Sequence, residues 1–497
     1  MASLSAKLIR GSFFRVANPI FNIAVSFFMI PFVIHSIGER WYGLWILTAT
    51  MVGYFGFLDL GIATANERFV ARALGQKDQE EINRVFSSSI FLFALVGIAS
   101  ILVTAIIIIV CPFFVKSTTD ISTFRIVIAI IGFDMAQQFP IRGFNGFLYA
   151  HIRYDIANII NILKLFLRTA LIVLALQHGH GIIALVVITL VVDLLESAAY
   201  VLYVFWGYPE TRIRISYFAK HTVKQLYNYS IYSFISNVAK QLRFNLDSLV
   251  ISGFLGLSPV THYSIGSRIA GYYNILVTEA ISSMKPVFSS LEGQGAFGEL
   301  REKYLFSVKL NTILSVFIGG SILIYGKAFI LRWMGNGYLD SFHVLVVLAL
   351  AMLCNTFQIP PATLLYGISK HKVYSFIVVG EGLVNLGLSL FLVKKYGIIG
   401  VALGTLIPIF VTSFFIVPYY ASHVIQVSSS RYTKVVMKGL ALGVLVHLAS
   451  WLAVRSFITL SYPRILVLSL ITSSIFLTVN MFVLLSRTER RYFSIPF

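Results

Sequence analysis

Charged side chains are scarce in this sequence, and their scarcity decides the class of protein. Asp, Glu, Lys and Arg make up 12% of the 497 residues, while 58% are hydrophobic. A soluble protein of this length could not bury so much apolar surface, so a soluble globular fold is excluded. Apolar stretches of about 20 residues recur along the chain, and each is long enough to cross a hydrocarbon core of roughly 30 Å. The sequence therefore predicts an all-α, polytopic membrane protein.

Patterns that would mark an enzyme or a cofactor site are also missing. The two cysteines, Cys111 and Cys354, lie far apart in or beside apolar runs, which indicates neither a disulfide framework nor a metal site. The glycines near Lys327 lack the spacing of a phosphate-binding loop, and no zinc-protease or nucleophile-elbow pattern occurs. We therefore predict no catalytic residues, no metal and no cofactor.

The apolar stretches predict about fourteen transmembrane helices. The first is too long for a signal peptide, so we expect it to be retained. The predicted spans are 13–35, 41–65, 86–111, 123–149, 156–176, 181–206, 227–253, 260–285, 305–331, 343–366, 375–393, 398–420, 436–455 and 464–485.

The net charge of +19 follows the connections between these spans. Lys and Arg are at least about twice as frequent in one alternating set of connections, which also contains both termini. By the positive-inside rule we expect both termini in the cytoplasm, and an even number of spans agrees. The basic residues are scattered over short loops rather than gathered on a soluble domain, so nucleic-acid binding is not expected.

The sequence also resembles itself after a shift of about 218 residues. "IGERWYGLWILTATMVGYF" (37–55) aligns with "LGLSPVTHYSIGSRIAGYY" (255–273), and "GQKDQEEINRVFSSS" (75–89) aligns with "GQGAFGELREKYLFS" (293–307). Six spans separate the copies, so we predict two six-helix lobes related by a pseudo-two-fold axis along the membrane normal. The expected divisions are 1–220, 221–425 and a C-terminal pair of helices with a cytoplasmic tail in 426–497.

Two prolines occupy nearly corresponding places in the two copies. Pro140 lies in "QFP" and Pro360 in "QIP", and a proline inside a helix removes a backbone hydrogen bond. Helix breaks at matching places in two halves often lie near a transport site, although a packing kink would look the same in the sequence. We predict helix breaks at both prolines.

Charges inside the predicted spans are the clearest functional signal. Each Lys, Arg or Asp at the bilayer centre costs roughly 2.5–3.5 kcal/mol, so such residues should face protein or water rather than lipid. In the seventh span they step by three and four, which places them on one helix face: Asn237, Lys240, Arg243 and Asp247. In the fifth span Asn161, Lys164 and Arg168 repeat the pattern without an acid in the same span.

Several of these charges have simpler explanations. Arg243 and Asp247 are four residues apart and would pair on one helix. Lys164 would reach the membrane surface by extending its side chain. Further intramembrane cations are Arg15, Arg142, Arg268 and Lys309, and the acids that we consider for ion coupling, gating or pairing are Asp59, Glu279 and Glu381.

Two stretches carry a resemblance to a known family. "FLDLGIATANERFVARALGQKDQEEINRVFSSSI" (57–90) resembles the second-span exit and cytoplasmic loop of bacterial polysaccharide flippases. "NLDSLVISGFLGLSPVTHYSIGSRIA" (245–270) resembles the seventh-to-eighth span region of the same family. These O-antigen and exopolysaccharide repeat-unit transporters belong to the superfamily of multidrug extruders and the lipid II flippase.

The resemblance implies a substrate and a mechanism. It implies two lobes around a cavity that opens alternately to each side of the bacterial inner membrane, and an oligosaccharide on polyprenyl pyrophosphate as substrate, with a polysaccharide polymerase as a candidate partner. A mildly positive cavity suits such an anionic head, because Arg and Lys bind pyrophosphate. The alternatives are a multidrug exporter of the same fold and a membrane glycosyltransferase or polymerase.

Overall fold

The structure is a computed structural model that describes residues 21–59, 62–113, 118–224, 246–282, 284–457, 461–486 and 489. Within these ranges the regular secondary structure is helical throughout, and no residue forms a strand. The described part of the chain confirms the predicted all-α class. The prediction for the seventh span, 227–253, falls mostly on residues 225–245, which lie outside the described residues.

The chain divides into two compact units. The N-terminal unit comprises Met1–Gln241 and Leu255–Thr261, and the C-terminal unit comprises Leu242–Phe254 and His262–Phe497. The last two helices of the chain pack on a long helix of the C-terminal unit and so belong to it. The divisions at 220 and 425 and the axis along the membrane normal stay predictions.

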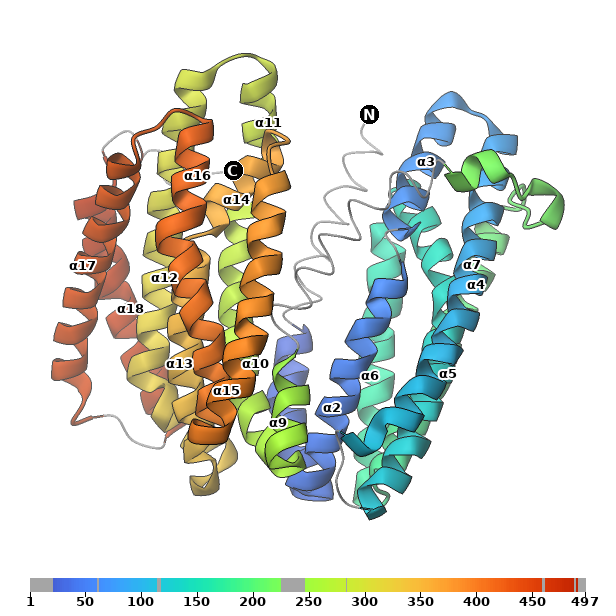
Figure 1. Ribbon diagram of the computed structural model, residues 1–497, viewed down its shortest axis with the longest axis horizontal. Coiled ribbons are helices and arrows are strands. Elements are labelled where there is room, and N and C mark those ends of the chain that lie inside the picture. Colours follow the sequence, from blue (N-terminus) through green and yellow to red (C-terminus); the bar gives the residue numbers. More distant parts are fainter. Residues whose placement is uncertain are drawn as a thin grey trace. The chain divides into compact units, whose positions relative to one another are not determined.

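The N-terminal unit is a bundle in which α4, α5, α6 and α7 run alongside one another (Figure 1). Helix α4 packs along α5, and α7 packs against both α5 and α6. A helix over Phe21–Ile37 precedes this set. The other elements are α2 (Glu39–Phe55), η1 (Gly56–Asp59), α3 (Ile62–Gln76), α4 (Gln79–Val110), η2 (Cys111–Phe113), α5 (Thr118–Ala150), α6 (Tyr154–Gln177), α7 (Ile182–Gly207) and η3 (Ile215–Tyr217).

The C-terminal unit is built around its longest straight helix, α12, which packs against α13, α17 and α18. Helix α13 also packs along α15. The elements, of which Leu255–Thr261 belong to the N-terminal unit, are α9 (Asp247–Leu255), α10 (Leu257–Ser282), α11 (Lys285–Gly293), α12 (Phe297–Met334), η4 (Asn336–Tyr338), α13 (Leu339–Thr356), α14 (Ile359–Gly367), α15 (Lys372–Val411), the π-helix η5 (Thr412–Ile416), α16 (Val417–Val424), α17 (Ser429–Val454) and α18 (Tyr462–Leu484).

Nine helical runs among the described residues are long and apolar enough to cross a membrane. One of them, Lys372–Val424, contains two predicted spans, because Gly397 interrupts α15 with φ 59° and ψ −138°. Glycine tolerates this left-handed backbone, which costs other residues about 1 kcal/mol or more. The nine runs correspond to ten predicted spans, whereas the predicted span 41–65 is not one helix, because α2 ends at Phe55 and α3 begins at Ile62. The count of fourteen stays a prediction.

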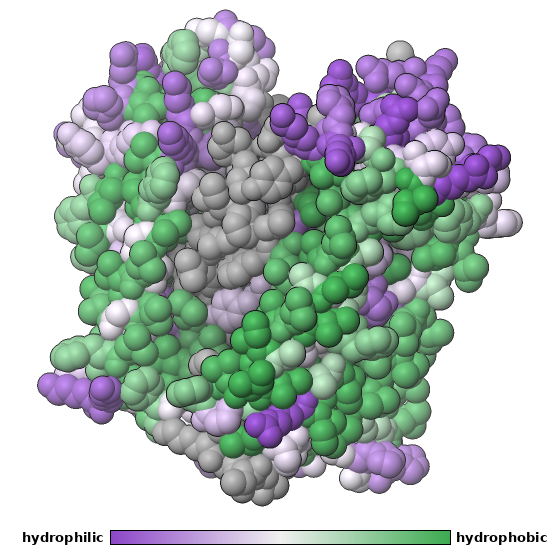
Figure 2. Space-filling view, turned by 45° about the vertical axis from the view of Figure 1, so that its right-hand side comes forward, coloured by the Kyte–Doolittle hydropathy of each residue, from purple (hydrophilic) through white to green (hydrophobic). Residues whose placement is uncertain are grey.

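Apolar side chains cover the middle of the helices on the face drawn in Figure 2, and hydrophilic side chains gather at the helix ends. Helix α4 illustrates the pattern, since Leu102 and Ile109 are 65% and 74% exposed. Such exposure of large apolar side chains is expected where the neighbouring medium is lipid. The bundle is therefore built to bury its polar groups inside and to present apolar groups outward.

The two predicted helix breaks differ in outcome. Helix α13 ends at Thr356 and α14 begins at Ile359, with Pro360 in its first turn, so the chain is interrupted there. Pro140, in contrast, lies inside the continuous helix α5, so the prediction of a break at Pro140 is wrong. A bundle in the membrane tolerates such a proline where a neighbouring helix packs against the freed carbonyl.

Candidate functional site

An ion cluster lies inside the N-terminal unit, where α5, α6 and α7 meet. The Lys164 ammonium on α6 lies 2.7 Å from Asp193 Oδ1 and 2.6 Å from Glu196 Oε2, both on α7. All three side chains are at least four-fifths buried. The positive charge of Lys164, which the sequence placed in a cationic cavity, is therefore compensated by two carboxylates from the neighbouring helix.

Helix α5 brings a third carboxyl group to this cluster. Asp134 is 3% exposed, and Gln137 and Gln138 on the same helix donate side-chain hydrogen bonds to it, each of 2.9 Å. The same Gln138 Nε2 donates to Asp193 Oδ2 at 2.8 Å. One amide nitrogen thus bridges two buried carboxyl groups, which places Asp134 and Asp193 in direct electrostatic contact.

The other polar residues of the predicted α6 stripe differ in their surroundings. Asn161 Nδ2 donates to the Ala157 carbonyl at 2.9 Å and lies 3.4 Å from the Tyr200 hydroxyl. Arg168 is partly buried one turn beyond Lys164 and forms no ion pair with any residue that the structure describes. Among the cations of α6, Arg168 is therefore the one whose charge the described part of the bundle leaves uncompensated.

Arg142 forms an ion pair elsewhere in the same unit. Its Nη1 donates to Asp59 Oδ2 at 2.9 Å, and its guanidinium lies over the Phe139 ring at 4.6 Å from the centroid. This contact joins α5 to η1, so the pairing alternative for Asp59 holds in this structure. The sequence predicted that Arg142, like Lys164, lies inside a transmembrane helix, but it did not indicate the partner of either residue.

A second polar cluster lies inside the C-terminal unit around Glu381 of α15. Glu381 is 3% exposed, and its carboxyl group accepts hydrogen bonds from Thr412 Oγ1 and, at 3.3 Å, from Gln358 Nε2. Gln358 lies in the break before α14, and its amide also donates to Thr412 and Ser413 of the π-helix at 2.8 and 2.7 Å. The two irregular segments of this unit therefore meet at one buried carboxyl group.

Asp247 extends the polar interior of the C-terminal unit. It is 7% exposed and accepts a hydrogen bond from the Tyr263 hydroxyl of α10. Thr405 interacts with the Asp247 carboxyl group and accepts a hydrogen bond from Asn385 Nδ2 at 3.2 Å. The expected Asp247–Arg243 pair involves a residue outside the described ranges, and the described partners of Asp247 are neutral.

The remaining predicted residues are not brought together by the described structure. Lys309 of α12 pairs with Glu489 at 2.8 Å, Arg268 is partly buried on α10, and Glu279 is exposed near the end of that helix. Arg15, Asn237, Lys240 and Arg243 lie outside the described residues. Of the eight predicted cations, five lie among the described residues, and only Lys164 and Arg168 of these share one helix face.

Sequence reasoning did not identify the carboxyl groups of the ion cluster as site residues. Asp134, Asp193 and Glu196 were visible as acids inside apolar spans, which is itself an indication of function. Their common partner was not visible, because Lys164 and Glu196 are 32 residues apart and meet only when α6 packs on α7. The sequence around Pro360 predicted a helix break, but it did not indicate that the neighbouring Gln358 contacts a buried carboxyl group.

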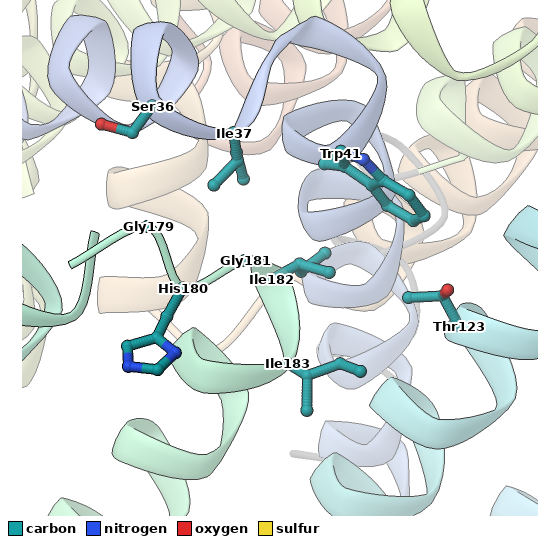
Figure 3. Close-up of a pocket in the computed structure, with 9 residues that line it drawn as sticks. All are labelled: Ser36, Ile37, Trp41, Thr123, Gly179, His180, Gly181, Ile182 and Ile183. Atoms are coloured by element: carbon teal, nitrogen blue, oxygen red, sulfur yellow. The ribbon is translucent and has the colours of Figure 1, made fainter. Parts of the chain in front are cut away.

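A separate cavity of about 400 Å³ opens at the N-terminal end of α7. Figure 3 shows Trp41 from α2 and Thr123 from α5 on one side of it, with Gly179–Ile183 beneath Ile37. None of the predicted site residues lines it. Among the described residues, no group of three or more His, Cys, Asp or Glu side chains is arranged to hold a metal ion.

Solved membrane transporters share this architecture. A lipid II flippase, MurJ, in an inward closed conformation aligns with a TM-score of 0.73 at 14% identity, covering 94% of this chain and 98% of MurJ. An inward-facing multidrug resistance transporter of the MATE family aligns with a TM-score of 0.71 at 14% identity, covering 82% and 94%. At such identities the likeness shows the fold alone.

Sequence comparison identifies the family within this fold. The profile of the family described as "Polysaccharide biosynthesis protein" matches residues 65–343, more than half of the chain, so the chain belongs to that family. A putative O-antigen transporter of Shigella flexneri is 22% identical over 383 residues, covering 75% of this chain and 88% of the relative. A probable flippase, AglR, of Haloferax volcanii is 24% identical over 422 residues, covering 81% of each.

Proposed function

We propose that this chain is a flippase for a lipid-linked oligosaccharide. It would carry a repeat unit on polyprenyl pyrophosphate from the cytoplasmic to the outer leaflet of the bacterial inner membrane. Membership of a polysaccharide biosynthesis family, relatives named as an O-antigen transporter and a flippase, and a fold shared with a lipid II flippase support this function. The division into two units suits alternating access, and a polysaccharide polymerase is the candidate partner.

The observation that carries the proposal at the level of residues is the face of α6 on which the described residues leave Arg168 without an opposite charge, beside the compensated Lys164. Lys164 and Arg168 lie one turn apart inside a membrane-length helix, and Arg168 has no ion-pair partner among the described residues. A guanidinium held there binds a pyrophosphate through two parallel hydrogen bonds, and an ammonium adds a point charge. Lys240, Arg243, Arg15 and Arg268 are proposed to extend this surface.

The C-terminal cluster is proposed as the element that responds to a coupling ion. Glu381 joins the break before α14 to the π-helix η5, and irregular helical segments of this kind are frequent at functional sites. A change in the charge of Glu381 would alter hydrogen bonds on both segments at once. Asp59 and Glu279 keep their proposed roles in gating.

The two alternative functions fit less well. A membrane glycosyltransferase is disfavoured because the relatives are named as transporters and flippases. The likeness to MATE transporters at 14% identity concerns the fold and does not favour that substrate class.

The test is transfer of a polyprenyl-pyrophosphate oligosaccharide between leaflets of liposomes that contain the purified chain. We expect Arg168→Ala to reduce the initial rate of transfer by roughly tenfold or more, because a charge-assisted contact to pyrophosphate is lost. Arg125→Ala is the matched control, since Arg125 is an exposed arginine on α5 of the same unit.

Two results would overturn parts of this proposal. Failure of the wild-type chain to move the substrate, in liposomes where the protein is folded and oriented, would remove the flippase function. Equal rates for the wild type, Arg168→Ala and Arg125→Ala would keep the function but remove the α6 face from the substrate path.

A further inference from the structure

The ion cluster of α5, α6 and α7 holds more negative charge than its one cation balances. Asp193 and Glu196 contact Lys164, and Asp134 joins them through the Gln138 amide, so the cluster would carry two net negative charges if every carboxyl group were ionised. Asp134 and Asp193 are 3% and 4% exposed. Charges buried in this way cost several kcal/mol each unless they are paired. The cluster therefore requires a further positive charge at neutral pH.

That positive charge is best supplied by a proton. The position that a metal ion would take between Asp193 and Glu196 is already occupied by the Lys164 ammonium, at 2.7 and 2.6 Å. Asp134 and Asp193 are bridged by the Gln138 amide, and two carboxyl groups that share a site seldom both ionise. One proton on this pair would leave the ammonium facing fewer negative charges.

The groups that face the cluster from each helix are few. Helix α5 contributes Asp134 with the neutral Gln137 and Gln138, α6 contributes Lys164, and α7 contributes Asp193 and Glu196. The Tyr200 hydroxyl of α7 lies near the end of this group and donates to the Ala157 carbonyl at 3.3 Å. Of these, the three carboxyl groups and the ammonium are the groups that can carry a charge at neutral pH.

We propose that Asp134, Asp193 and Glu196 form a proton-binding site, and that its protonation releases the Lys164 ammonium to the pyrophosphate of the substrate. The proposal rests on the proposed function and names the coupling ion for it. When Lys164 leaves, the carboxyl group that loses its counter-ion takes up a second proton from water, and the ammonium pairs with a pyrophosphate oxygen. Lys164 thus serves as an internal cation until the anionic head arrives next to Arg168.

This arrangement links two binding events. Anion binding and proton uptake each strengthen the other by the same free energy, as thermodynamic linkage requires. The affinity for a polyprenyl pyrophosphate should therefore fall as the pH rises through the range in which the cluster loses its proton. Uptake of a proton together with the anionic head also keeps the net charge inside the bundle small while the head is bound.

The experiment is calorimetric titration of the full-length protein in detergent with farnesyl pyrophosphate, a short polyprenyl pyrophosphate. Titrations in two buffers with different enthalpies of ionisation give the number of protons taken up per bound probe. We expect uptake of about one proton by the wild type. Lys164→Met should abolish this uptake and weaken binding on the order of tenfold, since a charged contact is lost.

Further variants separate the proton site from a merely structural role. Lys164→Arg should retain binding with proton uptake, whereas Asp193→Asn should bind the probe with an affinity that varies less with pH. Asp155→Asn is the matched control, because Asp155 pairs with Arg153 in the same unit outside the cluster. It should behave as the wild type in both measurements.

Each contrary result has a definite meaning. Binding by the wild type without proton uptake overturns the inference, as does unchanged uptake in Lys164→Met. A dependence of the affinity on sodium rather than on pH would overturn it in favour of a metal ion. Transfer of lipid-linked oligosaccharide in liposomes would persist in all three cases if only the inference fails, and would be absent in the wild type if the proposed function fails.

Discussion

At the scale of single residues, the Arg142–Asp59 pair is predicted to matter for stability as well as for position. Its side chains are 31% and 17% exposed, so removal of Arg142 leaves a mostly buried carboxylate without its partner. We expect Arg142→Ala to lower the free energy of unfolding by about 1–2 kcal/mol. Arg84→Ala is the control, because Arg84 pairs with Glu80, which is 68% exposed, and with Glu81, both on the same helix, and its loss should cost no more than about 0.5 kcal/mol.

Thermal unfolding of the two variants in the same detergent compares these costs. The double variant Arg142→Ala/Asp59→Ala should lose less than the sum of the two single losses, since the second change removes the orphaned carboxylate. Strict additivity would show that the 2.9 Å contact contributes no coupling energy.

The Lys309–Glu489 pair predicts a dependence of stability on pH. Burial alone would raise the pKa of Glu489, but hydrogen bonds from Lys309 Nζ and from Ser486 lower it below the ordinary value of 4.5. A carboxyl group with a lowered pKa adds stability above its unfolded-state pKa and loses it as the pH falls through the folded-state pKa. The difference in unfolding temperature between wild type and Glu489→Gln should be constant near neutral pH and should shrink below pH 4.5.

The matched control for this pH series is Glu292→Gln, since Glu292 is an exposed acid of α11 with no ion pair among the described residues. A difference between wild type and Glu489→Gln that stays the same down to about pH 3 would contradict the docking of Glu489 on Lys309.

The residue scale also shows what a sequence can predict of a site. The steps of three and four placed Lys164 and Arg168 on one face of α6, because helical geometry alone fixes that relation. The acids that compensate Lys164 lie 29 and 32 residues further along the chain and meet it only through packing of α6 on α7. The helical pattern therefore placed Lys164 on a polar face of α6, while its partners required the tertiary structure.

At the scale of helices, the contact between α4 and α5 is predicted to depend on Gly97. Pro140 has no N–H, so the carbonyl of Ala136 in α5 lacks its usual helical donor. A Cβ on Gly97 would lie 2.6 Å from that carbonyl oxygen, so only glycine allows α4 to approach it. Gly97→Ala should therefore lower the free energy of unfolding by about 1–3 kcal/mol.

The control is Gly387→Ala, because Gly387 lies within helix α15 and a Cβ there would meet nothing within 4 Å. This change should cost no stability, since alanine favours a helix over glycine by about 1 kcal/mol. Equal unfolding temperatures for the two alanine variants would show that the close approach of α4 to α5 does not stabilise the bundle.

The same contact explains why helices were easier to predict than their interruptions. Hydropathy located the described spans because each must be about 20 apolar residues long in any arrangement. Helix α5 continues through Pro140, and the sequence around this proline does not reveal that Gly97 of α4 packs against the freed carbonyl of Ala136. The chain is interrupted before Pro360, where Gln358 is bound by its side chain to η5 instead.

At the scale of the whole molecule, the composition of the sequence and its resemblance to a known family are sufficient to predict the fold class and the family. The scarcity of charge required a helical membrane protein, and residues 57–90 and 245–270 resembled polysaccharide flippases. The family match over 65–343 and the TM-score of 0.73 to a lipid II flippase agree with both. Physical constraints on a chain in lipid are few and strong, so the class follows from the sequence more readily than the partners of any one residue.

The direction of transport depends on which side of the membrane each end of a helix faces. Labelling at the two ends of α7 tests this orientation. His180 precedes and Ser216 follows this 26-residue helix, and both are exposed, so they lie at opposite ends of a segment about 39 Å long. The native cysteines Cys111 and Cys354 are free and buried, which keeps the background of labelling low. If both termini are cytoplasmic, a membrane-impermeant maleimide should label His180→Cys in intact cells and Ser216→Cys only after permeabilisation. The reverse pattern would invert the whole bundle, and the cytoplasmic loops predicted from Lys and Arg would then face outward.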